Sequence, residues 1–169
     1  AKSASTWISS LLSQHPEIEF PMLKEATFFN KYDFNGELNK KYKYGLDYYH
    51  RLWSQKGKNK YGEWSPQYLF DKSAASSIYK YSSNIKLLVI LRNPVHRAYS
   101  HFLYNQNFNK KIKQKFSFTA ACNEYNYLLK AGFYCEQLDR YYLIFPKKNI
   151  KIIIFENVIK NPLKTSKEL

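Results

Sequence analysis

Two short and almost uninterrupted apolar runs stand out along this chain. They are residues 86–91 (Lys-Leu-Leu-Val-Ile-Leu) and residues 151–155 (Lys-Ile-Ile-Ile-Phe). Runs of this length that are rich in branched aliphatic side chains are typical of parallel strands covered on both faces. We therefore predict two buried strands at these positions.

Helical spacing of the apolar residues is found on either side of these runs. It predicts a helix over residues 7–14, which the His15-Pro16 pair should end. Pro94 suits the first position of a longer helix that reaches about residue 108, because its missing N–H would be unpaired there anyway. Further predicted helices cover residues 46–53, 71–81, 117–126 and 133–145, with a short one after Asn161-Pro162.

The remaining segments are predicted to be extended or irregular. Residues 20–29 and 63–66 are expected to be extended, and lysine-rich loops are expected at residues 30–45, 54–62 and 109–115. Strands that alternate with helices indicate an α/β architecture with a parallel sheet. Because the chain has 169 residues and no internal repeat, we expect one domain over residues 1–169.

The charge balance is strongly basic, with 27 Lys and Arg against 13 Asp and Glu and a net charge of +14. Such a field attracts nucleic acids, acidic membranes, nucleotides and sulfated or carboxylated glycans, and the charge does not choose among them. No apolar run approaches about 18 residues, so no membrane span is predicted. Cys122 and Cys135 match no metal-ligand spacing, and they are either a disulfide pair or two buried free thiols.

Two segments carry residues suited to binding phosphate. Arg92 ends the first apolar run, a proline turn follows, and Ser100 lies in the second turn of the next helix. This arrangement directs a guanidinium and a hydroxyl beyond the end of a buried strand, although a surface arginine and a solvated serine are the simpler alternative. Residues 2–6 (Lys-Ser-Ala-Ser-Thr) precede a helix, where backbone N–H groups and the helix N-terminus can hold an anion. The alternative for this segment is a tail with a helix cap.

Taken together, these segments resemble the PAPS-dependent sulfotransferases, most closely the heparan sulfate type with its N-deacetylase/N-sulfotransferase and 3-O-sulfotransferase families. The similarity includes Lys-Glu-Ala-Thr-Phe-Phe at 24–29, Glu-Trp-Ser-Pro at 63–66 and Leu-Arg-Asn-Pro-Val-His-Arg-Ala-Tyr-Ser-His-Phe at 91–102. It continues through residues 132–138 and 154–157. The resemblance implies a three-layer, P-loop-like α/β fold with a central parallel sheet flanked by helices.

The resemblance also implies a site. Arg92 and Ser100 correspond to the pair that binds the 3′-phosphate of PAPS, and Glu25 to the general base for the acceptor hydroxyl or amine. Lys2 would also stabilise charge on the departing phosphosulfate oxygen, and no metal is expected. Lys24 and Trp64 are the candidate acceptor-binding residues. The loop that binds the 5′-phosphosulfate would consist of Lys2, Ser3, Ala4, Ser5, Thr6 and Trp7.

This chain departs from the family pattern at several points. Ala4 stands where the loop usually has Gly, and Trp64 stands where the family often has Lys. The family has a strand before the phosphate loop and a basic, cofactor-covering part beyond the equivalent of Leu169, so the domain is expected to be incomplete at both termini. The four histidines are expected to be structural or surface residues. The lysine-rich loops would suit an anionic glycan as acceptor.

Two other classes of function fit part of the pattern. A basic module that binds single-stranded nucleic acid is compatible with the charge and the aromatic content. No RRM, OB or helix-turn-helix signature supports it, and we expect no nucleic-acid partner. A P-loop kinase relative would share the fold, but the Gly-x-x-x-x-Gly-Lys-Ser/Thr pattern and an obvious magnesium-binding Asp are missing.

Overall fold

The strands form two parallel pairs in the computed structural model, which describes residues 2–33, 36–53 and 60–169. Strand β1 (Ile18–Glu19) pairs with β2 (Lys60–Tyr61), and β3 (Leu87–Leu91) pairs with β4 (Ile150–Ile154). In the second pair Leu87 lies opposite Ile150, and the register continues without a bulge to the last residues of both strands. Both strands predicted from the apolar runs are confirmed, within one residue at each end. Their complete burial is not: β3 is partly buried throughout, and Ile152 and Ile154 of β4 are exposed.

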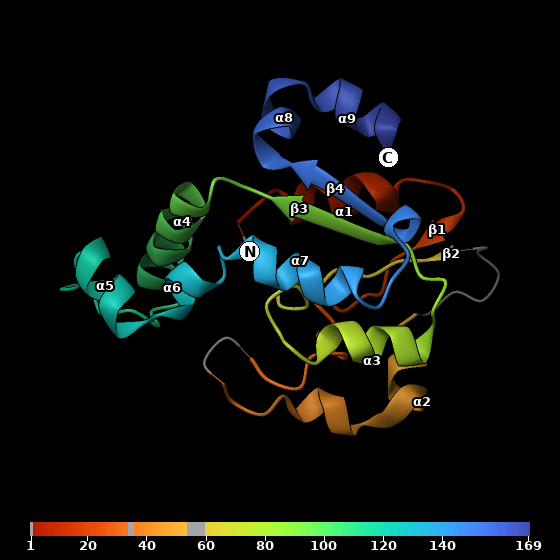
Figure 1. Cartoon of the computed structure of the whole chain (residues 1–169), viewed down its shortest axis with the longest axis horizontal. Helices are drawn as coiled ribbons and strands as arrows, with labels where there is room; N and C mark the ends of the chain where they lie inside the picture. Colours follow the sequence, from red (N-terminus) through yellow and green to blue (C-terminus); the bar gives the residue numbers. More distant parts are fainter. Residues whose placement is uncertain (1, 34–35, 54–59) are drawn as a thin grey trace.

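Helices pack against both faces of β3, and β4 adds Ile150 and Ile153 to the same two clusters. Leu87 and Val89 point into a cluster with α3 (Ala74–Tyr81) and α7 (Tyr134–Tyr142). Leu88 and Ile90 point the other way, into a cluster with α1 (Ser5–Ser13) and α8 (Phe155–Lys160). This alternation is the period-two pattern of a strand with two covered faces. Figure 1 shows α7 and α3 on one side of the strand pair and α8 with α9 (Pro162–Glu168) beyond the other. The predicted three-layer α/β architecture is confirmed.

The residues of β3 are nevertheless only partly buried. An apolar cavity of about 1270 Å³ lies beside the strand, and its wall includes Leu88, Ile90, Ile8 and Phe20. In the described part of the chain, β4 is the one strand paired with β3. The strand is therefore covered by helices above and below but is open along one edge, which explains why it is less buried than the apolar run predicted.

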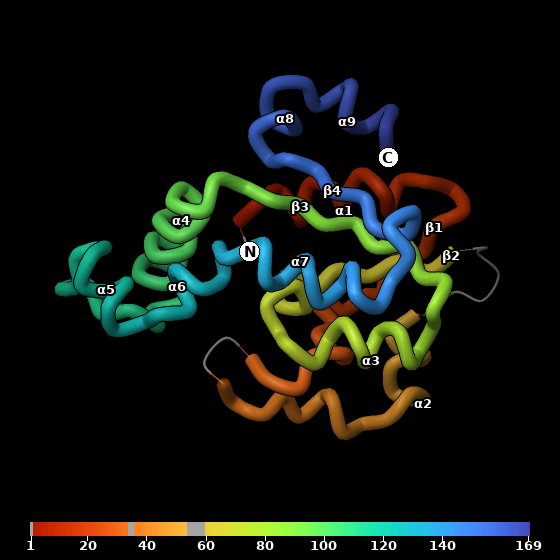
Figure 2. Tube along the Cα trace, in the orientation of Figure 1, coloured from red at the N-terminus to blue at the C-terminus, as the bar shows by residue number. Residues whose placement is uncertain are grey.

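A lobe of helices lies at one end of the molecule. It consists of α4 (Pro94–Asn107), α5 (Phe118–Glu124) and α6 (Tyr127–Lys130), and Figures 1 and 2 show it to one side of the strands. Its core contains Phe102, Leu128 and Ile112. Ile112 is only 1 % exposed, so the lysine-rich segment around it packs against the lobe through this side chain.

The shorter elements depart more from the sequence prediction. Helix α2 (Gly45–His50) ends earlier than predicted, and α6 and α8 were not predicted as separate helices. The prediction that residues 20–29 are extended is wrong, because Glu25 and Thr27 have left-handed backbones with φ of 58° and 51°. The loop predicted at residues 54–62 lies outside the described residues except at its end, where β2 begins. The two remaining elements are the 3₁₀ helices η1 (Lys40–Lys43) and η2 (Lys147–Asn149).

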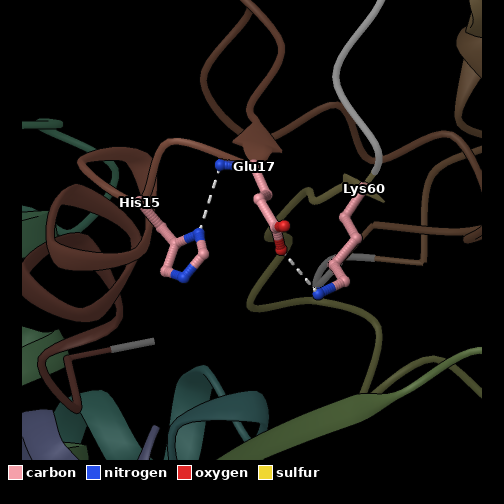
Figure 3. A network of polar contacts seen from close by, with 3 residues as sticks. All are labelled: His15, Glu17 and Lys60. Atoms are coloured by element: carbon pink, nitrogen blue, oxygen red, sulfur yellow. Dashed lines mark hydrogen bonds and ion pairs between the residues drawn. The ribbon is translucent and has the colours of Figure 1, made fainter.

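His15 is structural, as the sequence suggested. Helix α1 ends just before it, and its Nδ1 accepts a hydrogen bond of 3.2 Å from the backbone N–H of Glu17 (Figure 3). The carboxylate of Glu17 pairs with Lys60 Nζ at 3.0 Å, which links the exit of α1 to β2. Both side chains are largely exposed, so this ion pair adds at most about 1 kcal/mol.

Some general properties of the described residues bear on function. Cys122 is buried and Cys135 is exposed, and both are free thiols. Across the ranges that the structure covers, no three His, Cys, Asp or Glu side chains come together as a metal site would require. None of the helices in these ranges combines the length and apolar character needed to span a bilayer.

Candidate active site

The loop before α1 has an unusual backbone. Lys2 and Ala4 have φ of 65° and 58°, in the left-handed region that glycine adopts most easily. The carbonyl of Ala4 accepts the first helical hydrogen bond, from Ile8 N–H at 3.0 Å. Ala4 therefore takes the glycine-like conformation at the position where the family usually has Gly. The N–H groups of the first turn of α1 are left free to bind an anion.

A second left-handed loop carries Glu25, and distant residues hold it in place. The hydroxyl of Ser65 accepts a hydrogen bond of 2.9 Å from Thr27 N–H. Lys41 Nζ donates to the carbonyl of Ala26 at 3.3 Å, and the amide of Asn39 donates to the carbonyl of Thr27. The Glu-Trp-Ser-Pro segment thus fixes the Glu25 loop through its serine.

The two loops face each other across a cleft of about 490 Å³. In the described part of the chain, four of the five non-glycine residues with positive φ lie in these loops. Strained backbone of this kind persists where the surroundings enforce it, and it is concentrated at functional sites. Seven of the predicted site residues line the cleft: Lys2, Ser3, Ala4, Ser5, Thr6, Lys24 and Glu25.

Lys2 extends into this cleft. Its ammonium lies over the ring of Tyr104, 3.1 Å from the ring centroid. Burial lowers the pKa of Lys2, while the charge of Glu25 raises it and that of Lys24 lowers it further. The general base and the cation predicted from the sequence therefore influence each other electrostatically, as neighbouring groups in one site should.

Arg92 lies directly after β3 and contacts the loop before α1. Its Nη1 donates to the carbonyl of Lys2 at 2.8 Å, and its guanidinium lies over the ring of Phe155 at 4.5 Å. Its Nε is buried and has no hydrogen-bond partner in the structure. A buried donor without a partner is expensive, so Arg92 retains a donor that an anion could satisfy.

The turn after Arg92 sets the direction of α4. Asn93 caps the helix, with its side-chain oxygen accepting from the N–H groups of Val95 and His96, and Pro94 occupies the first position as predicted. The carboxylate of Glu156 accepts from Asn93 N–H at 2.9 Å, and this bond lowers the pKa of Glu156. The turn between Arg92 and α4 is therefore held by the side chain of Asn93 within the helix and by Glu156 from outside it.

Four predicted site residues do not line the cleft: Trp7, Arg92, Ser100 and Trp64. Trp7 is in the first turn of α1 and is 38 % exposed, and Ser100 is partly buried on α4. Trp64 also lies elsewhere. It lines the large apolar cavity beside β3 and packs edge-on against Phe20, with ring centroids 5.9 Å apart. Its predicted contact with an acceptor stays a prediction.

The far wall of the cleft was missed by sequence reasoning. Helical spacing from Ser100 places Tyr104 on the same face of α4, and this was the available signal. His101 also lies on this wall, and burial lowers its pKa to about 3, so it is neutral at physiological pH. The residues missed on this wall are His101, Tyr104, Asn105, Asn109, Lys111 and Tyr127.

Glu63 is a carboxylate whose two oxygens are shielded from solvent, and it lies beside the cavity rather than the cleft. Burial raises its pKa to about 7, and the hydroxyl groups of Tyr68 and Tyr49 offset part of this effect. Neither hydroxyl is placed to donate a hydrogen bond to the carboxylate of Glu63. The first residue of the Glu-Trp-Ser-Pro segment is therefore a carboxyl that is readily protonated.

Comparison with known proteins shows the family to which the chain belongs. A family model for the sulfotransferase domain matches residues 1–169. The chain is 25 % identical over 193 residues to the bifunctional heparan sulfate N-deacetylase/N-sulfotransferase of Drosophila melanogaster, covering 99 % of this chain and 18 % of that protein. It is 30 % identical over 110 residues to heparan sulfate glucosamine 3-O-sulfotransferase 5 of Mus musculus, covering 60 % and 32 %.

A crystal structure of a sulfotransferase from Alicyclobacillus acidocaldarius is similar over 99 % of this chain and 75 % of its own, with 30 % identity and a TM-score of 0.81. The chain spans between 18 % and 32 % of the length of the curated relatives it matches. Because the family model matches every residue of the sequence, this chain belongs to the sulfotransferase domain family.

Proposed function

We propose that this domain transfers a sulfuryl group from PAPS to a hydroxyl or amine of a carbohydrate acceptor. The observation that carries the proposal is the cleft in which the N-terminal loop and the Glu25 loop face each other. Two of the similar proteins are named for sulfation of heparan sulfate, which supports a carbohydrate as the acceptor.

The residues present fit an anionic donor. The free N–H groups at the start of α1, the hydroxyls of Ser5 and Thr6 and the ammonium of Lys2 would hold the 5′-phosphosulfate end. Arg92 and Ser100 would hold the 3′-phosphate, for which the unpaired Nε of Arg92 is a suitable donor. Because Arg92 also binds the carbonyl of Lys2, the two binding regions are connected. PAPS would supply the activated sulfuryl group.

The reaction needs one base and one stabilising cation. Glu25 would accept the proton of the acceptor hydroxyl or amine as the new bond to sulfur forms and the bond from sulfur to the phosphate oxygen breaks. Lys2 would stabilise the charge on that oxygen as PAP leaves. Such a loose, in-line transfer depends on positioning and charge stabilisation, and a positioned base adds about 10²–10⁴-fold.

The cleft carries more positive than negative side chains. Lys2, Lys24 and Lys111 line it, against Glu25 and Asp33. This composition and the net charge of +14 favour an acceptor that carries sulfate or carboxylate groups. We therefore propose an anionic glycan as the acceptor class.

The test is Glu25→Gln, assayed for transfer of labelled sulfate from PAPS to a glycan and for binding of PAP. We expect transfer to fall by at least about 100-fold with PAP affinity unchanged. The matched control is Glu124→Gln, which removes an exposed carboxylate at the end of α5 and should alter neither quantity. Retained transfer in Glu25→Gln would show that another group is the base.

A further inference from the structure

The aromatic ring beneath Lys2 belongs to Tyr104, which is 36 % exposed and stacks against a neighbouring ring. Tyr104 lies in the last part of α4, and its carbonyl accepts hydrogen bonds from the N–H groups of Phe108 and Asn109, at 3.0 and 3.1 Å. The ring of Phe108 stacks on that of Tyr104, with centroids 5.7 Å apart and an angle of 28° between the planes. Phe108 itself is 76 % exposed. Its main contact is therefore with Tyr104 rather than with the core, and it braces that ring.

Lys2 reaches the ring from the loop before α1. Its backbone is left-handed, its carbonyl accepts a hydrogen bond from Arg92, and its side chain extends into the cleft. At 3.1 Å from the centroid, its ammonium is in direct contact with the face of the Tyr104 ring. A cation in this position is attracted by the negative face of the ring.

A ring suits this position better than a carboxylate would. Burial disfavours the charged form of Lys2, so the ammonium needs a stabilising neighbour within the cleft. A carboxylate in contact would neutralise the cation and would repel an anionic donor. The ring stabilises the ammonium without a formal negative charge, so its full charge stays available to a phosphosulfate group.

We propose that Tyr104 is a positioning residue that holds the Lys2 ammonium on the face of its ring, ready for the leaving phosphosulfate oxygen. This inference rests on the proposed function for the role of Lys2. The contact between the two side chains is a separate statement, and it can be measured without any reaction.

The experiment compares Tyr104→Phe, which keeps the ring, with Tyr104→Leu, which removes it. Tyr99→Leu is the matched control, because Tyr99 is an exposed residue of the same helix whose ring packs against Phe118 rather than at the cleft. Two quantities are measured in each variant. The first is the NMR shift of the Lys2 ε-methylene in protein labelled with carbon-13 lysine, and the second is kcat and KM for transfer from PAPS.

We expect an upfield ring-current shift of the Lys2 signal in the unsubstituted protein, Tyr104→Phe and Tyr99→Leu, and its loss in Tyr104→Leu. In parallel, kcat should fall by about 2- to 30-fold in Tyr104→Leu only, with KM for the acceptor unchanged. Rescue by Phe separates positioning by the ring from a role of the hydroxyl.

Three outcomes would overturn the inference by itself. They are an unshifted Lys2 signal in protein that binds PAP, an unchanged kcat in Tyr104→Leu, and a fall in kcat of equal size in Tyr104→Phe, because the ring would then not be the cause. If the unsubstituted protein neither binds PAP nor transfers sulfate, the proposed function fails, and the role of Tyr104 in that reaction fails with it.

Discussion

Glu63 should make the free energy of unfolding depend on pH in a way that one substitution removes. Both of its carboxylate oxygens are shielded from solvent, and burial raises its pKa from 4.5 to about 7. A raised pKa means that the folded state favours the protonated form. The resulting stabilisation is fully present below about pH 4.5 and is lost as the pH rises through 7.

The size of the effect follows from the two pKa values. Each pKa unit corresponds to about 1.4 kcal/mol, so ionised Glu63 costs the folded state about 3 kcal/mol at pH 8 relative to pH 4. Glu63→Gln keeps the size and polarity of the side chain but cannot ionise. We therefore expect the unfolding free energy of the variant, minus that of the unsubstituted protein, to increase by about 3 kcal/mol between pH 4 and pH 8.

The assay is urea unfolding followed by tryptophan fluorescence at a series of pH values. Glu124→Gln is the control for removing one negative charge from a protein with a net charge of +14. Taking the difference between variant and unsubstituted protein cancels the contributions of other titrating groups. A difference that stays constant or decreases from pH 4 to pH 8 would refute the reasoning.

Three further predictions concern local features. Ala4→Gly should keep PAP binding and change the free energy of unfolding by less than about 1 kcal/mol. The reason is that glycine relieves the left-handed backbone strain but gives the unfolded chain more conformational freedom. A larger loss of unfolding free energy in urea would contradict this. The lowered pKa of His101 means that the unfolded state binds a proton more readily, so the unsubstituted protein should lose about 2 kcal/mol of unfolding free energy between pH 7 and pH 5. His101→Gln should remove this loss. Plots of unfolding free energy against pH that run parallel for the two proteins would contradict it. Asn93→Ala should cost about 1 kcal/mol through loss of the cap of α4, whereas Asn161→Ala, which makes no side-chain cap to α9, should cost less in the same denaturation assay.

The parts of the fold with local sequence signals were predicted well. The apolar runs of β3 and β4, the proline at the start of α4 and the stop at His15 each act through a few neighbouring residues. The path from Arg92 through Asn93 to Ser100 follows from the same kind of local signal. In these segments the side-chain pattern and the backbone preference agree, so the sequence determines the structure over a short range.

The parts that failed depend on contacts far apart in the sequence. The Glu25 loop takes a left-handed course because Ser65, Asn39 and Lys41 hold its backbone, and no pattern within residues 20–29 encodes this. The direction of Trp64 depends on Phe20 and the cavity beside β3.

The far wall of the cleft shows the same limit in the active site. The family resemblance implied the N-terminal loop and Glu25 but did not include Tyr104 or Lys111. Tyr104 is placed by its position on α4, whereas Lys111 is placed by Ile112, whose burial holds the segment after α4 against the helical lobe. A single isoleucine among lysines is the local signal for that contact.

The central claim is that this domain binds PAPS through the N-terminal loop and through Arg92 with Ser100. Thermal unfolding with PAP and with 5′-AMP, which lacks the 3′-phosphate, tests it directly. At a PAP concentration of 100 times Kd the fold should gain about 2.7 kcal/mol, or about 5–10 °C in Tm, and AMP should give much less at the same concentration. Arg92→Ala should abolish the advantage of PAP over AMP, whereas Arg51→Ala, which removes an exposed arginine after α2, should keep it. Equal shifts with PAP and AMP, or no shift with either, would contradict the account.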